Sequence, residues 1–134
     1  MSSQEFQMKK FLFLIFFTPL AMARCDYSDL AGTWDFYGAS AEGYTICTLR
    51  ITGSGNLNER WSTCMDLNGN VSPAIQGSGT FELKVDSNCY LSGSADTRDF
   101  GRGQFVGTIN RDRSIMTLFA SNGVSYTTLH GVKH

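Results

Sequence analysis

The sequence predicts an all-β domain that folds as an antiparallel up-and-down barrel of eight strands. Three observations lead to this fold class. Gly32-Thr33-Trp34 opens a run of short alternating segments, and in small barrels such a tryptophan closes the base while the glycine lets the first strand bend. Strands and turns then follow one another at roughly ten to fourteen residues without a helical stretch. Fourteen glycines, two prolines and 13% aromatic residues are typical of a turn-rich β-domain.

Each predicted strand alternates apolar and polar residues between turn signals. In the fourth strand, for example, Phe81, Leu83 and Val85 are expected to face inward, between the outward Glu82 and Lys84. The predicted strands span residues 34–39, 44–52, 57–67, 79–85, 89–95, 103–110, 114–121 and 124–132. Turns or loops are expected at residues 53–56, 68–73, 86–88, 111–113 and 122–123. Closure into a barrel is favoured over a two-sheet sandwich because closure removes exposed edge strands.

The N-terminal stretch has the features of an export signal. Met8-Lys9-Lys10 supplies a positive region, residues 11–20 are mostly apolar, and Ala21-Met22-Ala23 resembles a cleavage site. Residues 1–23 are therefore predicted to be a signal peptide, with 1–7 a spurious start, and residues 24–134 a single β-barrel domain. The apolar run is too short to span a bilayer, so we expect an exported protein, periplasmic or secreted, without a membrane span.

Charge argues against nucleic acid as the partner. The chain has 11 basic and 12 acidic residues. Loss of Lys9, Lys10 and Glu5 with the signal leaves nine basic and eleven acidic residues, a net charge of −2. A weakly acidic domain with scattered Lys and Arg lacks the basic surface that phosphate backbones require.

Four cysteines in the exported part predict two disulfides. Cys25 precedes the first strand and Cys89 opens the fifth, so both are expected at the same end of the barrel. Cys47 lies early in the second strand and Cys64 late in the third, so they face each other near the opposite end. The strand directions therefore predict Cys25–Cys89 and Cys47–Cys64.

No pattern in the sequence predicts catalysis, a metal or a cofactor. The two histidines, His130 and His134, have no neighbouring motif of a nucleophile and base, and phosphate-binding glycine motifs are absent. The segment Asp66–Asn70 begins like a calcium loop, but Val71 stands where the turn glycine belongs and Gly77 where the closing glutamate belongs. We expect a binding protein rather than an enzyme.

The most concentrated charged segment, Asp96–Gly103, joins the fifth and sixth predicted strands. Exposed Arg and aromatic side chains at a loop tip are good anchors for a protein partner. The alternative is a solvated turn with local Asp–Arg pairs. As a recognition loop, this segment would act through Arg98, Asp99, Phe100 and Arg102.

Two resemblances follow from these residues. The Gly32-Thr33-Trp34 opening with an eight-strand meander resembles the calycin group, which includes lipocalins and avidins. The lipocalin resemblance implies that a basic residue after the last strand, here Lys133, accompanies Trp34 in plugging the barrel. The chain also resembles bacterial periplasmic inhibitors of secreted metalloproteinases, which belong to the same group. That resemblance is carried by Leu30-Ala31-Gly32-Thr33-Trp34, Cys47-Thr48-Leu49, Trp61 and Cys64.

Two functions remain open at this point, and both describe a monomer without a cofactor. A carrier of a small apolar ligand requires a cavity inside the barrel. Its predicted lining is Phe36, Leu49, Trp61, Phe81, Leu83, Phe105 and Phe119. An inhibitor of an exported enzyme such as a protease requires a filled interior and recognition loops at the rim.

Overall fold

A computed structural model describes residues 24–40, 43–75, 79–97 and 101–134 of the chain. Within these residues nine strands form one antiparallel sheet, in the order β4-β3-β2-β1-β9-β8-β7-β6-β5. The strands are β1 (Gly32–Ser40), β2 (Gly43–Ile51), β3 (Thr63–Met65), β4 (Val71–Pro73), β5 (Thr80–Val85), β6 (Tyr90–Thr97), β7 (Gly101–Ile109), β8 (Ile115–Ser121) and β9 (Tyr126–Lys133). Short 3-10 turns lie at η1 (Tyr27–Asp29) and η2 (Glu59–Trp61).

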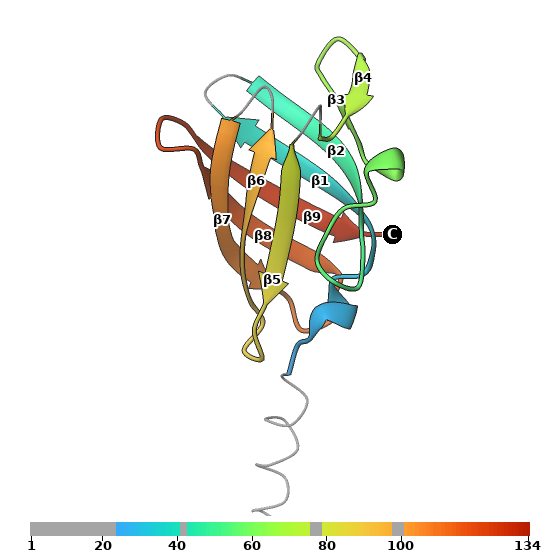
Figure 1. Ribbon diagram of the computed structural model, residues 1–134, viewed down its shortest axis with the longest axis vertical. Helices are drawn as coiled ribbons and strands as arrows, with labels where there is room; N and C mark the ends of the chain where they lie inside the picture. The colour runs from blue at the N-terminus through green and yellow to red at the C-terminus, as the bar shows by residue number, and fades with distance from the viewer. Residues whose placement is uncertain (1–23, 41–42, 76–78, 98–100) are drawn as a thin grey trace, which may run out of the picture.

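The sheet curls into a half-barrel (Figure 1). The first long strand, β1, pairs with β9, which joins the two ends of the chain in the middle of the sheet. The edges are β4 and β5, and the described residues show no strand pairing between them. The two sides of the curl meet where Leu83 N–H donates to the Gly55 carbonyl at 2.8 Å. The expected closed barrel of eight strands is thus corrected to a curled sheet of nine.

The difference arises in the predicted third strand, residues 57–67, of which Thr63–Met65 forms a strand while Leu57 makes only an isolated bridge to Ile51. The Ser62 hydroxyl takes the place of a backbone acceptor, because it accepts from Arg50 N–H at 3.0 Å. The same hydroxyl donates to the Asn58 carbonyl at 2.9 Å, and Asn58 N–H donates to the Arg50 carbonyl. The chain between these contacts loops outward as η2. The strand β4 forms within the expected loop and ends at Pro73, a residue that sheets tolerate at an edge.

The contact between the two sides of the curl requires a glycine at position 55, and this requirement can be tested. Gly55 has a φ of +81°, and a Cβ added to it would lie 1.9 Å from the Leu83 carbonyl oxygen. Gly69 has the same φ, but among the described residues no atom lies within 4 Å of its Cβ position. Both positions disfavour L side chains, whereas only Gly55 also presses against a neighbouring strand.

We therefore expect Gly55→Ala to lower the free energy of unfolding by about 2–3 kcal/mol, through backbone strain plus a clash with the sheet. Gly69→Ala, the matched control, should cost about 1 kcal/mol from backbone strain alone. Urea unfolding followed by circular dichroism measures both. Equal losses would show that the contact between Gly55 and Leu83 does not form in solution.

Four turns in the described chain share one construction. In each turn, the backbone carbonyl of the first residue accepts a hydrogen bond from the N–H of the fourth residue. The side-chain oxygen of the first residue accepts a second hydrogen bond, from the N–H of the fifth residue. The first residues are Thr52, Asp66, Asp86 and Asn110. The fourth residue has a positive φ in every case, and these residues are Gly55, Gly69, Cys89 and Arg113. Positive φ is unusual outside glycine, so Cys89 and Arg113 stand out.

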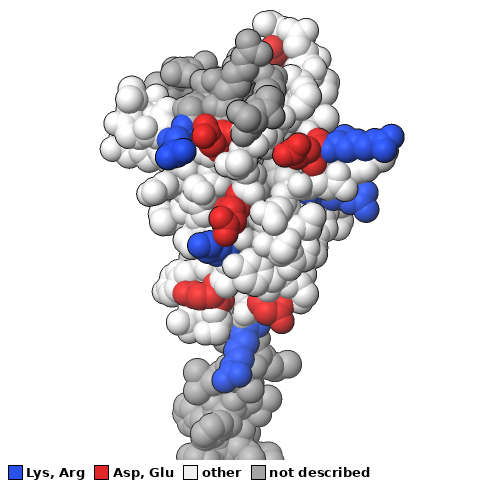
Figure 2. All heavy atoms as spheres, viewed as in Figure 1, with Lys and Arg blue, Asp and Glu red and all other residues white. Residues whose placement is uncertain are grey.

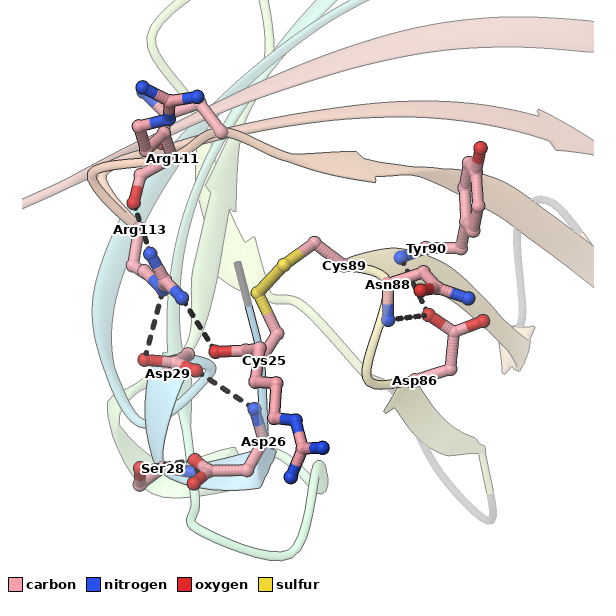
Figure 3. The surroundings of a disulfide bond; sticks show 12 residues. Cys25, Asp26, Ser28, Asp29, Asp86, Asn88, Cys89, Tyr90, Arg111 and Arg113 are labelled. Atoms are coloured by element: carbon pink, nitrogen blue, oxygen red, sulfur yellow. Dashed lines mark hydrogen bonds and ion pairs between the residues drawn. A yellow bond between two sulfur atoms is a disulfide. The ribbon is translucent and has the colours of Figure 1, made fainter. Parts of the chain in front are cut away.

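Both of these unusual residues fasten the N-terminal segment to the sheet (Figure 3). Cys89 forms the disulfide with Cys25. Arg113 donates to the Arg24 carbonyl at 2.6 Å and lies 3.6 Å from the Asp29 carboxylate. Backbone strain persists only where surrounding contacts hold it in place. Here the side chains at the strained positions are those that hold the N-terminal segment against the lower end of the half-barrel.

Candidate functional site

Trp34 closes the lower end of the half-barrel, where the N-terminal segment lies. Its side chain is fully buried, and its indole Nε1–H donates to the Leu30 carbonyl at 2.9 Å. The Lys133 ammonium lies 5.4 Å from the centre of the Trp34 ring, a cation–π distance, and donates to the Asp29 carbonyl. The structure therefore brings together Trp34 and Lys133, the two residues expected at the base.

The inner face above Trp34 is filled by large side chains that press on glycines of neighbouring strands. The Phe36 ring lies within 3 Å of the place that a Cβ on Gly131 would occupy. The Phe105 ring lies 3.1 Å from the corresponding place on Gly93. Aromatic rings thus pack directly on the backbone opposite them. A ligand has no place at this level unless these side chains move.

The upper end of the inner face differs from the lower end. Four inward-facing residues, Phe81, Ala95, Thr127 and Leu129, are only partly buried there. Thr45, which lies opposite the inward Gly38, is exposed. The inward Leu83 and Met116, which lie farther from this end, are fully buried. Among the described residues, the inner face is therefore more accessible near the upper end than around Leu83 and Met116. We call these five residues, Thr45, Phe81, Ala95, Thr127 and Leu129, the upper inner face.

The structure places the residues of the predicted cavity lining in two groups. Phe36, Leu49, Leu83 and Phe105 are buried, and Phe81 lies partly buried with its ring 5.5 Å from that of Phe105. Trp61 and Phe119 are wrong, because they are 56% and 57% exposed on the outside. Trp61 lies in η2, outside the ladder, with Arg60 over its ring. Phe119 lies between the inward Leu118 and Ala120, so the period of two residues turns it outward.

Both disulfides join the cysteines that the strand directions predict. Cys25–Cys89 spans 64 residues of sequence at the lower end. Cys47–Cys64 links directly opposite residues of β2 and β3 and lies higher on the inner side. The described chain contains no free cysteine. Two disulfides are consistent with an oxidising, exported location.

The predicted recognition loop is described only in part. Arg98, Asp99 and Phe100 lie outside the described residues. Arg102 is exposed on β7 and lies 3.8 Å from the Asp96 carboxylate of β6, a pair of the kind that contributes little to stability. On the face shown in Figure 2, acidic and basic side chains are interspersed rather than gathered by sign. Nothing in this part of the molecule favours the rim over the inner face as the binding site.

Two further carboxylates, Asp35 and Asp66, are held by local hydrogen bonds. The His134 ring, 2.6 Å from the Asp35 carboxylate, lowers the pKa of Asp35, and the Thr48 hydroxyl adds to the effect. Backbone and side-chain hydrogen bonds from Asn70 lower the pKa of Asp66, whose oxygens are thereby occupied as turn acceptors. No group of three or more His, Cys, Asp and Glu side chains within the described ranges is arranged to hold a metal ion. Nor does the described chain contain a helix long and apolar enough to cross a membrane.

Most of the upper inner face lies outside the lining that the sequence predicts, because Ala95, Thr127 and Leu129 do not belong to that set. These residues can be identified by their position, because every second residue of a strand faces the same side of the sheet. Ala95 follows Leu91 and Gly93 on one face of β6, and Thr127 precedes Leu129 and Gly131 on one face of β9. The period of two residues along β6 and β9 therefore places Ala95, Thr127 and Leu129 on the inner face.

These features define an all-β protein whose nine described strands form a single antiparallel sheet that curls into a half-barrel. Among solved structures, a de novo designed fluorescence-activating β-barrel is similar to it. The alignment covers 78% of this chain and 93% of the designed chain, with a TM-score of 0.52 and 16% sequence identity. At this identity the likeness concerns the fold alone. No protein-family model matches the chain, and no curated protein is significantly similar in sequence.

Proposed function

We propose that this chain is an exported, non-catalytic binding protein that holds a small apolar ligand on the upper inner face. The observation that carries the proposal is the contrast along the inner surface. Most inward apolar residues farther from the upper end are buried, although Val85 is only partly buried, whereas Phe81, Ala95 and Leu129 are partly accessible near the upper end. Ligand sites in barrels combine such apolar surface with a few polar groups at the mouth. The designed barrel with a similar fold, named for activating fluorescence, is compatible with this function.

The rigidity of the surroundings supports the same function. The disulfide Cys47–Cys64 fixes β3 against β2 beside the upper inner face. Phe105 anchors Phe81 from below, through rings 5.5 Å apart. A site that is largely formed before the ligand arrives loses less conformational entropy on binding.

The proposal is tested with Nile red, a neutral dye whose emission rises in apolar surroundings. Ala95→Trp places a large ring on the upper inner face, so we expect the Kd for the dye to rise by at least about tenfold through exclusion of the ligand. Ser94→Trp is the matched control, because Ser94 is the preceding residue on β6 and is exposed on the outer face. Its Kd should match that of the parent protein.

Thermal unfolding checks that both variants remain folded. If the parent protein does not bind the dye, or if both tryptophan variants weaken binding equally, the upper inner face is not the ligand site and the proposed function fails.

A further inference from the structure

The described strands carry almost no charge on the inner surface. Along them, every second side chain points inward, in keeping with the period of two. Of these inward side chains the single ionisable one is Lys133, which lies at the lower end over the Trp34 ring. Trp34 is fully buried, so this ammonium is separated from the upper inner face by the packed core.

Two charged residues that the structure describes near the upper end, Asp96 and Arg102, point the other way. Asp96 and Arg102 are paired neighbours on β6 and β7, and they form an exposed ion pair on the outer side. Ala95 and Gly103, their immediate neighbours, are also paired and face inward. The same two strands therefore present charge to solvent and uncharged surface to the interior.

The polar groups that the upper inner face does offer are hydroxyls. Thr127 faces inward, because its γ-methyl lies 3.6 Å from the place that a Cβ on Gly38 would occupy. Thr45 lies directly opposite Gly38 on the other neighbouring strand. A threonine hydroxyl can donate a hydrogen bond to a ligand oxygen and can accept one from a ligand hydroxyl. It carries no charge that would neutralise an ionised ligand group.

We propose that the ligand class of this site is electrically neutral: an apolar body carrying at most a hydroxyl or carbonyl group at its outer end. This inference rests on the proposed function and narrows it. An ionised carboxylate or ammonium moved onto the upper inner face would lose hydration without gaining an opposite charge, and such a transfer is strongly unfavourable. Fatty-acid anions and alkylammonium ions are therefore expected to bind more weakly than the corresponding alcohols.

The test compares three competitors of equal chain length at neutral pH, each displacing Nile red from the disulfide-bonded protein. The competitors are decanol, decanoate and decylammonium, which differ in charge at one end. We expect decanol to displace the dye at a concentration at least about tenfold lower than either ion. The cation separates this effect from the protein's overall charge, because a net charge of −2 would favour decylammonium over decanoate but would not favour decanol over both.

A substitution then supplies the missing charge. Thr127→Lys places an ammonium at the mouth and should strengthen displacement by decanoate at least about tenfold, while weakening or leaving unchanged that by decylammonium. Thr128→Lys is the matched control, since Thr128 is the next residue on β9 and lies on the opposite face, beside Ala39 and Phe119. It should leave the order of the competitors unchanged. If Thr127→Lys does not fold, Thr45→Lys supplies the same charge from β2.

The outcomes separate the two proposals. Absence of Nile red binding to the parent protein overturns the proposed function and this inference with it. Dye binding with equal displacement by all three competitors leaves the function standing and overturns neutrality. Both proposals are supported if only decanol displaces the dye from the parent protein, and if decanoate gains displacement in Thr127→Lys but not in Thr128→Lys.

Discussion

Replacing Trp34 with alanine is expected to lower the free energy of unfolding by about 3–5 kcal/mol, the range for removing a large aromatic side chain from a core. Trp34 is fully buried, packs against Phe36 with ring centroids 6.4 Å apart, and closes the lower end. The substitution leaves a cavity. It also removes the indole N–H that donates a hydrogen bond to the Leu30 carbonyl. Urea unfolding followed by far-ultraviolet circular dichroism measures the loss.

Two controls separate the contributions at this site. Trp34→Phe keeps most of the packing but removes the hydrogen bond to Leu30, and should account for about 1–2 kcal/mol of the loss. Trp61→Ala removes the other tryptophan, which is exposed and stacked with Arg60, and should cost about 1 kcal/mol or less. A Trp61→Ala loss as large as that of Trp34→Ala would contradict the assignment of Trp34 to the base.

Removal of the Cys25–Cys89 disulfide by paired serine substitutions is expected to cost about 4 kcal/mol, because the bond closes a long loop in the unfolded chain. The same change at Cys47–Cys64, which are 17 residues apart, should cost about 3 kcal/mol. Non-reducing urea unfolding of the two double variants measures the difference. The reverse order would show that the N-terminal tether contributes less than its loop length implies.

The conformation of Cys89 refines this prediction. Its φ is +67°, a region that costs an L residue about 1–2 kcal/mol and costs glycine little. Cys25→Ser combined with Cys89→Gly should therefore be more stable than Cys25→Ser with Cys89→Ser by about 1 kcal/mol. Equal stabilities would indicate that the turn changes conformation once the disulfide is absent.

Much of the strand pattern is available from local sequence. The expected inward residues Phe81, Leu83 and Val85 do face inward, because alternation in a half-buried strand is a local property. The disulfide pairing follows from strand directions alone. The continuous strand expected over residues 57–67 does not form, because the Ser62 hydroxyl accepts the backbone N–H of Arg50. This hydrogen bond joins residues twelve positions apart, and no local sequence pattern predicts it.

Local patterns predict that this chain forms antiparallel strands, which cysteines pair and that Trp34 lies at the start of the first long strand. These patterns are the period of two residues, the turn residues and the strand directions, and each is a property of neighbouring residues. Contacts between distant segments set the half-barrel of nine described strands, the exposure of Trp61 and Phe119, and the part of the inner surface that is accessible. These outcomes depend on how distant segments meet, as Gly55 meets Leu83, and on which small residues lie opposite large ones across the interior.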